Sequence, residues 1–101
     1  MKEYKEITIV FSGSLERILV NELKVLKITK YAIITGMKVS WNEKVKHLDT
    51  HVWPGTDDAL IIIMEKEKAK ELIEVLEILK DNLNYDTKFT ISMKSLEYYS
   101  E

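Results

Sequence analysis

The feature that most constrains this chain is the repetition of one pattern, strand–helix–strand, in two units of similar length. Short runs of β-branched and aromatic residues predict the strands, and apolar residues at three- and four-residue spacing predict the helices between them. The predicted elements are strands at residues 7–11, 31–41, 59–64 and 88–93 and helices at residues 15–27 and 66–81. Two such units in 101 residues predict one domain, over residues 1–101, with one hydrophobic core.

The order βαββαβ is typical of the ferredoxin-like arrangement. Right-handed crossovers in both units place the two helices on the same face of a four-stranded antiparallel sheet. The predicted fold class is therefore α+β. Ser14 stands at the start of the first helical pattern and is its predicted N-cap.

The opposite face of such a sheet has no helix to cover it. The side chains predicted to line this face are Val10, Ile34, Trp41 and Ile62. An apolar face of this kind exceeds what a monomer comfortably exposes, which predicts self-association. After the last strand, Leu96, Tyr98 and Tyr99 form an apolar tail that we expect to pack against the protein rather than stay in solvent.

Composition and charge exclude several classes of function. Fifteen basic and seventeen acidic side chains are mixed along the chain, and Arg17 is the single arginine. A nucleic-acid-binding surface needs clustered lysine and arginine, so no nucleic-acid partner is expected. The lack of cysteine excludes disulfides, thiolate nucleophiles and zinc–thiolate sites. No apolar run approaches the roughly 18 residues of a membrane span, and no signal-peptide core is evident, which predicts a cytoplasmic protein without membrane insertion.

The segment 47–55 is the part of the chain that fold-building explains least. It holds both histidines, one of the two tryptophans, the single proline and one of the three glycines. His47, Asp49 and His51 are spaced by two, so an extended backbone would point all three side chains to one side. Two imidazoles and a carboxylate can bind Zn²⁺, Ni²⁺ or Cu²⁺. The alternative is a polar connecting arm whose histidines face water or an adjacent subunit.

The turn at residues 53–55 joins this segment to the most apolar strand. Proline fixes φ and glycine permits a positive φ, so the sequence Trp-Pro-Gly predicts a sharp reversal. The reversal would return Asp57 and Asp58 toward the histidines as further oxygen ligands of a metal. In the structural interpretation, Trp53 packs against an apolar edge or a neighbouring copy. In the functional interpretation, Trp53 and Trp41 wall a small-molecule cleft between subunits.

Enzymatic activity is not predicted. The sequence has no Ser-His-Asp order in a convincing context, no glycine-rich phosphate cradle and no cysteine. Asp49 and His51 have the residue types of a catalytic acid–base pair, but no nucleophile is evident beside them.

The run from Thr50 to Leu60 (Thr-His-Val-Trp-Pro-Gly-Thr-Asp-Asp-Ala-Leu) and the Lys/Glu-rich stretch 67–72 resemble the small PII-like proteins, relatives of nitrogen regulatory protein P-II with a shortened loop. The resemblance implies a ferredoxin-like protomer and a homotrimer with its sheets facing inward. It also implies a regulatory or signalling role, with a small ligand at the subunit clefts and a protein partner such as a transporter or an enzyme. The candidate cleft residues are Trp41, His51, Trp53 and Gly55.

One departure from the family concerns the cofactor. PII proteins proper hold a nucleotide phosphate with a glycine-rich, basic segment between the second helix and the last strand. Residues 80–88 stand at this place and contain neither glycine nor arginine, which makes a nucleotide doubtful. The sequence leaves the ligand unknown, with a divalent metal as an option. The alternative function is metal binding or metal tolerance in the same trimeric architecture, which the divalent-cation tolerance proteins of the CutA type share through fold alone.

Overall fold

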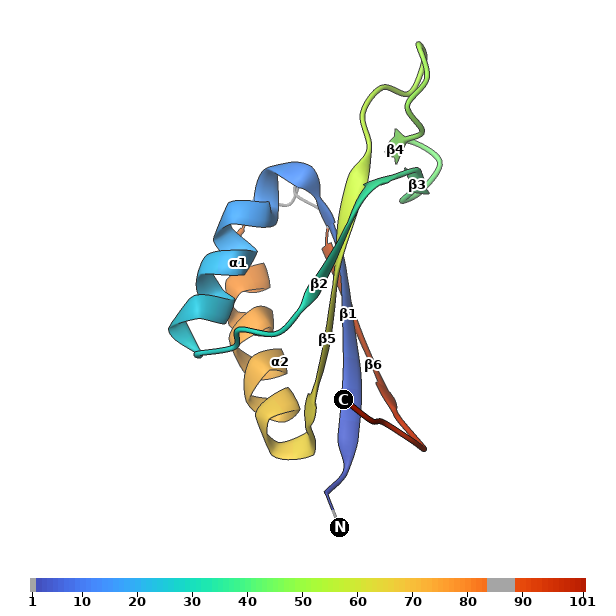
Figure 1. Ribbon diagram of the computed structural model, residues 1–101. Coiled ribbons are helices and arrows are strands. Elements are labelled where there is room, and N and C mark those ends of the chain that lie inside the picture. The colour runs from blue at the N-terminus through green and yellow to red at the C-terminus, as the bar shows by residue number, and fades with distance from the viewer. Residues whose placement is uncertain (1, 84–88) are drawn as a thin grey trace.

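The computed structural model describes residues 2–83 and 89–101. Its elements follow the predicted order, with two short strands added between the second and third long ones (Figure 1). They are β1 (Tyr4–Ser12), the 3₁₀ turn η1 (Gly13–Leu15), α1 (Glu16–Val25), β2 (Ala32–Met37), β3 (Val39–Ser40), β4 (Lys46–His47), β5 (Asp57–Glu65), α2 (Lys66–Asp81) and β6 (Phe89–Ser95).

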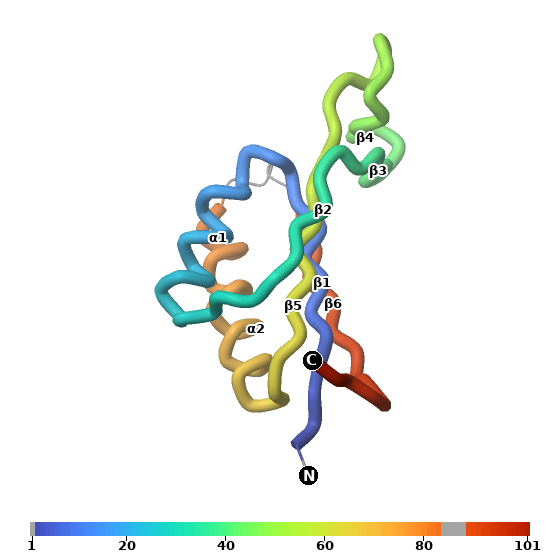
Figure 2. Tube along the Cα trace, viewed as in Figure 1, coloured from blue at the N-terminus to red at the C-terminus, as the bar shows by residue number. Residues whose placement is uncertain are grey.

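The long strands form one four-stranded sheet in the order β2-β5-β1-β6, and every neighbouring pair is antiparallel. Both helices lie on the same side of this sheet, as the ribbon and the chain trace show (Figure 1, Figure 2). This is the ferredoxin-like α+β fold, and the prediction is confirmed. None of the described helices is long and apolar enough to cross a membrane.

The core lies between the sheet and the two helices. Alternate residues of β1 and β5 face the helices, and the register sets Ile7 opposite Ile62 and Ile9 opposite Leu60, all with no exposed surface. The helices contribute their apolar stripes to the same cluster. These buried helical residues are Leu19 and Leu23 of α1 and Ala69, Leu72 and Leu76 of α2. Each fully buried leucine or isoleucine contributes roughly 1.5–3 kcal/mol to folding.

The first helix starts differently from the prediction. Ser14 is not an N-cap, because the chain leaves β1 through the 3₁₀ turn Gly13–Leu15 and Ser14 lies inside that turn. The residue before α1 is Leu15, and no side chain caps the helix there. The helix ends in a Schellman motif, in which Ile28 N–H donates to Leu23 O at 2.8 Å and Lys27 takes a left-handed φ of 59°.

We call the face of the sheet opposite the helices the open face. Val10 and Ile34 both pair with Ala59, which points away from the helices because its neighbour Leu60 points toward them. Both residues therefore lie on the open face, where Ile34 is 45% exposed. Two residues predicted for this face are elsewhere. Ile62 points to the helices, because it stands opposite the buried Ile7. Trp41 lies outside the four-stranded sheet, in the turn after β3.

The tail after β6, residues 96–101, turns back across β1 on the side away from the helices (Figure 1), and its end lies beside Lys30. Leu96 N–H donates to Tyr4 O at 3.1 Å, and the rings of Tyr99 and Tyr4 have centroids 5.0 Å apart. The ammonium group of Lys30 contacts the Tyr99 hydroxyl and the Glu101 carboxylate. The predicted packing of the tail is confirmed for Tyr99 and wrong for Tyr98, which is 82% exposed.

Candidate functional site

Residues 38–56 form an arm that extends past one end of the four-stranded sheet (Figure 1). Just before the arm, the pairing of β2 with β5 is irregular between Ile34 and Met37. Gly36, within this irregular stretch, has a positive φ of 73°. The strand predicted at 31–41 therefore divides into β2 and the arm strand β3. This division agrees with the change along it from a continuously apolar sequence to an alternating one.

The half of the arm near the sheet is a small hairpin. β3 and β4 pair as an antiparallel two-stranded sheet, with Val39 opposite His47. The Asn42 side chain closes the connection, because its Oδ1 accepts the N–H groups of Lys44 and Val45, each at 2.8 Å. This is an Asx turn, which builds the reversal without a glycine.

The far half of the arm, residues 48–55, is a compact loop rather than an extended segment. Asp49 N–H donates to Gly55 O at 2.9 Å, and Trp53 N–H donates to Thr50 Oγ1 at 2.9 Å. Gly55 has a φ of 86°, so the positive φ expected of the Trp-Pro-Gly turn is present. Asp49 also has a positive φ, of 54°, which reverses the chain between the two histidines.

The extended geometry assumed for the metal site is therefore wrong. His47, Asp49 and His51 do not converge, because the left-handed backbone at Asp49 removes the two-residue alternation. Within residues 2–83 and 89–101, no three or more histidine, cysteine or acidic side chains gather closely enough to hold a metal ion. The two aspartates after the turn are engaged elsewhere, Asp57 with His47 and Trp41, and Asp58 with the N–H of Gly36 at 3.2 Å.

The arm is joined to the sheet through Asp57, the first residue of β5, which is buried. Its Oδ2 accepts the Trp41 indole Nε1–H at 2.8 Å. The Nδ1 atom of His47 lies 2.8 Å from Asp57 Oδ1 and 2.7 Å from Oδ2. We call Trp41, His47 and Asp57 the carboxylate cluster. Both side chains that contact this carboxylate come from the arm, so the cluster sets the direction in which the arm leaves the sheet.

The prediction from sequence paired His47 with the wrong partners because it relied on two-residue spacing. The sequence did contain a signal for the true partner of His47. Asp57 lies two residues before the most apolar run, 59–64, and a carboxylate carried into a buried strand must find hydrogen-bond donors. The indole of Trp41 and one of the two histidines were the available donors nearby in sequence.

The four predicted cleft residues lie at different levels of the arm. Trp41 belongs to the carboxylate cluster at the base, whereas Trp53 lies in the far half, with the Lys46 ammonium 5.6 Å from its ring centroid. His51 is exposed and Gly55 occupies the turn back to β5. A single copy thus brings Trp41 together with His47 and Asp57, and places His51, Trp53 and Gly55 in the far loop.

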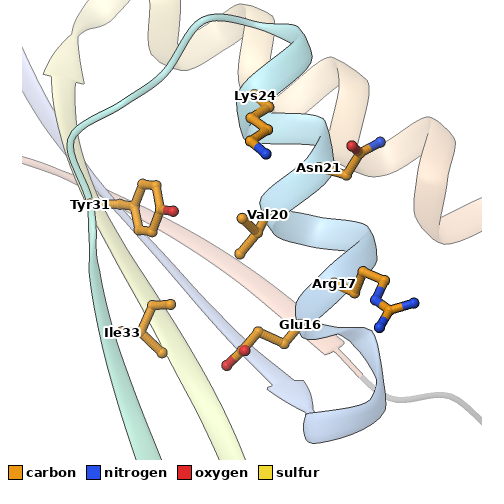
Figure 3. Close-up of a pocket in the computed structure, with 7 residues that line it drawn as sticks. All are labelled: Glu16, Arg17, Val20, Asn21, Lys24, Tyr31 and Ile33. Atoms are coloured by element: carbon orange, nitrogen blue, oxygen red, sulfur yellow. The ribbon is translucent and has the colours of Figure 1, made fainter.

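Surface hollows also lie outside the arm, and two of them border the sheet. One, of about 330 Å³, lies between α1 and the edge strand β2, where the Tyr31 ring and Val20 face each other (Figure 3). It is lined by Glu16, Arg17, Val20, Asn21, Lys24, Tyr31 and Ile33. The other, of about 440 Å³, lies between the tail and the open face, with Ile61 and Ile63 among its lining residues.

The tail carries the clearest electrostatic perturbations. The Glu101 carboxylate, followed by the Tyr99 hydroxyl, raises the pKa of Lys30 above its ordinary value. The hydrogen bond from Lys30 in turn lowers the pKa of Glu101. Both groups are fully exposed, so this pair is a surface contact that salt screens.

Neither protein-family models nor curated protein sequences match this chain. Its fold, however, matches solved structures over nearly the whole length. CPII, a nitrogen regulatory PII-like protein from Thiomonas intermedia K12 solved with ADP, AMP and bicarbonate, gives a TM-score of 0.67 at 10% identity and covers 97% of both chains.

Two further structures agree with this match. A putative PII-like signaling protein from Thermus thermophilus gives a TM-score of 0.63 at 23% identity, covering 93% of this chain and 87% of the other. A functionally unknown protein from Pediococcus pentosaceus gives 0.66 at 10% identity, covering 100% and 99%. At these identities the likeness establishes the fold, and the predicted resemblance to PII-like proteins is confirmed at that level. The chain has the fold of the PII-like proteins.

Proposed function

We propose that this chain is a PII-like regulatory protein that binds a small ligand at clefts between copies and modulates a protein partner. The observation that carries the proposal is the match to PII-like structures over nearly the full length of both chains. The arm between β2 and β5 adds support, because it is a folded projection whose direction is fixed at its base by the carboxylate cluster. A regulatory role rather than a catalytic one agrees with the sequence, in which no nucleophile is evident beside Asp49 and His51.

An adenine nucleotide is the first ligand to test. The CPII structure holds ADP, AMP and bicarbonate, which favours a nucleotide despite the lack of glycine and arginine in residues 80–88. Residues 84–88 of that segment lie outside the described part of the chain. In the proposal, the base of the arm contributes Trp41 to the ligand cleft, and the far loop of a neighbouring copy contributes His51, Trp53 and Gly55.

The proposed assembly is a homotrimer that buries the open face. This face carries Val10, Ile34, Ile61 and Ile63 on three adjacent strands, and the tail crosses it beside Tyr4, Ile61 and Ile63. Burying apolar surface against sister copies is the main force available for such an association.

Metal binding is the second candidate function, and one contact favours it. A metal-ligating histidine usually holds its other ring nitrogen against a carboxylate, and Asp57 holds Nδ1 of His47 in this way. One imidazole is an incomplete ligand set, so the metal would need ligands from neighbouring copies.

Thermal unfolding in the presence of single ligands tests both functions. ADP, AMP, bicarbonate, Zn²⁺ and Cu²⁺ are added one at a time to the metal-free protein. A ligand at about 100 times its Kd stabilises the folded state by about 2.7 kcal/mol, which raises the Tm of a chain of this size by roughly 10 °C or more. We expect ADP or AMP to raise the Tm. Stabilisation by a metal alone would favour the second function, and no shift with any of them would contradict both.

A further inference from the structure

The contact between His47 and Asp57 anchors the arm, and it also fixes where the imidazole of His47 carries its proton. The Asp57 carboxylate is fully buried, and its contacts come from ring nitrogens of the arm at 2.7–2.8 Å. An ionised carboxylate only accepts hydrogen bonds, so each ring nitrogen that contacts it must carry a proton. For Trp41 this condition is always met, because the indole nitrogen is a donor only.

For His47 the same condition selects one tautomer. A neutral imidazole has one N–H and one lone pair. The contact with Asp57 requires the proton on Nδ1, so the lone pair is on Nε2, at the opposite side of the ring. The His47 side chain is 30% exposed, whereas that of Asp57 is 1% exposed. Asp57 occupies the Nδ1 side of the ring, so Nε2 is the ring nitrogen that this carboxylate does not contact.

We propose that Asp57 is a positioning residue that holds His47 as the Nδ1–H tautomer, so that Nε2 at the base of the arm accepts a hydrogen bond from the bound ligand. This inference rests on the proposed function for the presence of a ligand. Beyond the proposed function, it specifies how the ligand is recognised. The ligand must present a hydrogen-bond donor, such as an amino or hydroxyl group, to Nε2 of His47. Both groups are present on an adenine nucleotide, in the exocyclic amine and the ribose.

His51 provides a control inside the same chain. It is the only other histidine, it is exposed, and it lies in the far loop of the arm. Within the described residues no carboxylate is hydrogen-bonded to His51, so we expect its imidazole to take either tautomer.

The first experiment reads the tautomers directly and needs no ligand. Long-range ¹H–¹⁵N spectra of the ¹⁵N-labelled full chain are recorded at a pH at which both imidazoles are neutral. We expect His47 to be protonated at Nδ1, and His51 to show the averaged pattern of a solvated ring. In Asp57→Asn the amide can donate to Nδ1, so His47 should move to the Nε2–H tautomer, the change that the corresponding substitution causes in a Ser-His-Asp triad.

A persistent Trp41 indole signal in Asp57→Asn would establish that the variant keeps the arm in place. If His47 in the wild-type chain carries its proton on Nε2, or if its tautomer does not respond to Asp57→Asn in a folded variant, the positioning role is overturned.

The second experiment measures ADP binding by calorimetry. In His47→Asn the side-chain amide can still donate to Asp57 from near the Nδ1 position, but nothing replaces Nε2. We expect binding about three- to tenfold weaker than in the wild type, the usual effect of one hydrogen bond, and a comparable loss in Asp57→Asn. His51→Asn is the control for the spectra alone, and should retain the Nδ1–H signal of His47. It is not a control for ADP binding, because His51 itself belongs to the proposed cleft.

The outcomes of the two experiments separate the inference from the proposed function. Equal ADP affinity in His47→Asn and wild type overturns the acceptor role of Nε2. If the wild-type chain does not bind ADP, nucleotide binding fails and the acceptor role fails with it, whereas the tautomer spectra still decide whether Asp57 positions His47.

Discussion

At the scale of single residues, Asp57 connects the arm to the sheet. A charged side chain with no exposed surface is costly unless hydrogen bonds compensate for its lost hydration. Trp41 and His47 supply those bonds from two different parts of the arm. The identities of these three residues are therefore tied to one another, although they lie up to sixteen positions apart in the sequence.

Removal of the Asp57 carboxylate should weaken the fold measurably. In Asp57→Ala the donors of Trp41 and His47 lose their acceptor, which should lower the free energy of unfolding by about 1.5–3 kcal/mol. Urea denaturation followed by circular dichroism measures the change. Asp49→Asn, in the far loop of the arm, retains the cluster and should change the stability by less than about 0.5 kcal/mol. A loss below that level in Asp57→Ala would contradict the anchoring role.

A second prediction concerns the end of α1, where Lys27 has a φ of 59° in the Schellman motif. Glycine adopts this left-handed conformation without the steric cost that a Cβ brings. Lys27→Gly should therefore stabilise the protein by about 0.5–1 kcal/mol, as measured by chemical denaturation. The same change inside the helix, Lys24→Gly, should instead destabilise by about 1 kcal/mol. Destabilisation in both variants would show that the helix does not end at this position.

At the scale of elements, the helices and long strands were predictable because they follow hydrophobic periodicity. α2 spans Lys66–Asp81, the range that the apolar spacing predicts, and β5 extends the predicted apolar run by a few residues at its ends. The arm was predictable only as a departure from periodicity. Its internal structure depends on single side-chain hydrogen bonds, such as those of Asn42 and Thr50, and on the positive φ of Asp49, which no periodic pattern encodes.

The candidate site likewise contains one feature that was predictable from the sequence and one that was not. The Trp-Pro-Gly turn was predictable because proline and glycine restrict the backbone locally. The pairing of His47 with Asp57 was not, because it depends on how the hairpin of β3 and β4 folds over the start of β5. The choice of Ile62 for the open face failed for a related reason, since the face that a strand residue occupies follows from a register that only pairing fixes.

The contact between Lys30 and Glu101 at the end of the tail should be lost at low pH. The hydrogen bond from Lys30 lowers the pKa of Glu101 in the folded protein, so the contact is fully present above the ordinary carboxyl pKa and is lost as pH falls through the lowered value. Because the pKa of Lys30 is raised, its ammonium group stays charged, and the contact stays present, up to strongly alkaline pH. Chemical shifts of the Tyr99 ring, followed from neutral to strongly acidic pH, report the loss of the contact between Lys30 and Glu101.

Two matched variants identify the group responsible for this transition. Glu101→Gln should remove the acid transition of the Tyr99 signals, whereas Glu97→Gln, in the same segment, should leave it in place. Added salt should weaken the contact, because both side chains are exposed. A transition that is unchanged in Glu101→Gln would exclude the Lys30 pair as its cause.

At the scale of the whole molecule, the two faces of the sheet differ in what covers them. The helices bury one face, whereas the other exposes Ile34 and is crossed by the tail near Tyr4, Ile61 and Ile63. In the proposed trimer the open faces of three copies meet, and each arm leaves from the rim of that contact. Ligand binding at the arm base would then depend on assembly, since residues of the far loop reach the cleft from a neighbouring copy.

A charge on the open face should disrupt the assembly and leave the protomer folded. Ile34 is already 45% exposed in the single copy, so Ile34→Lys costs the protomer little, but in the trimer it would bury an unpaired ammonium group. Ile78 is 64% exposed on α2, on the other side of the molecule, and Ile78→Lys is the matched control. We expect Ile34→Lys to be monomeric with an unchanged circular dichroism spectrum and Ile78→Lys to assemble as the wild type does.

The mass of the wild-type protein in solution, measured by sedimentation equilibrium at micromolar concentration, decides whether sister copies cover the open face. We expect three times the chain mass of 11.8 kDa for the wild type and for Ile78→Lys, and the mass of one chain for Ile34→Lys. A well-folded wild-type protein that sediments as one chain would contradict burial of the open face by sister copies, and the ligand cleft between copies with it.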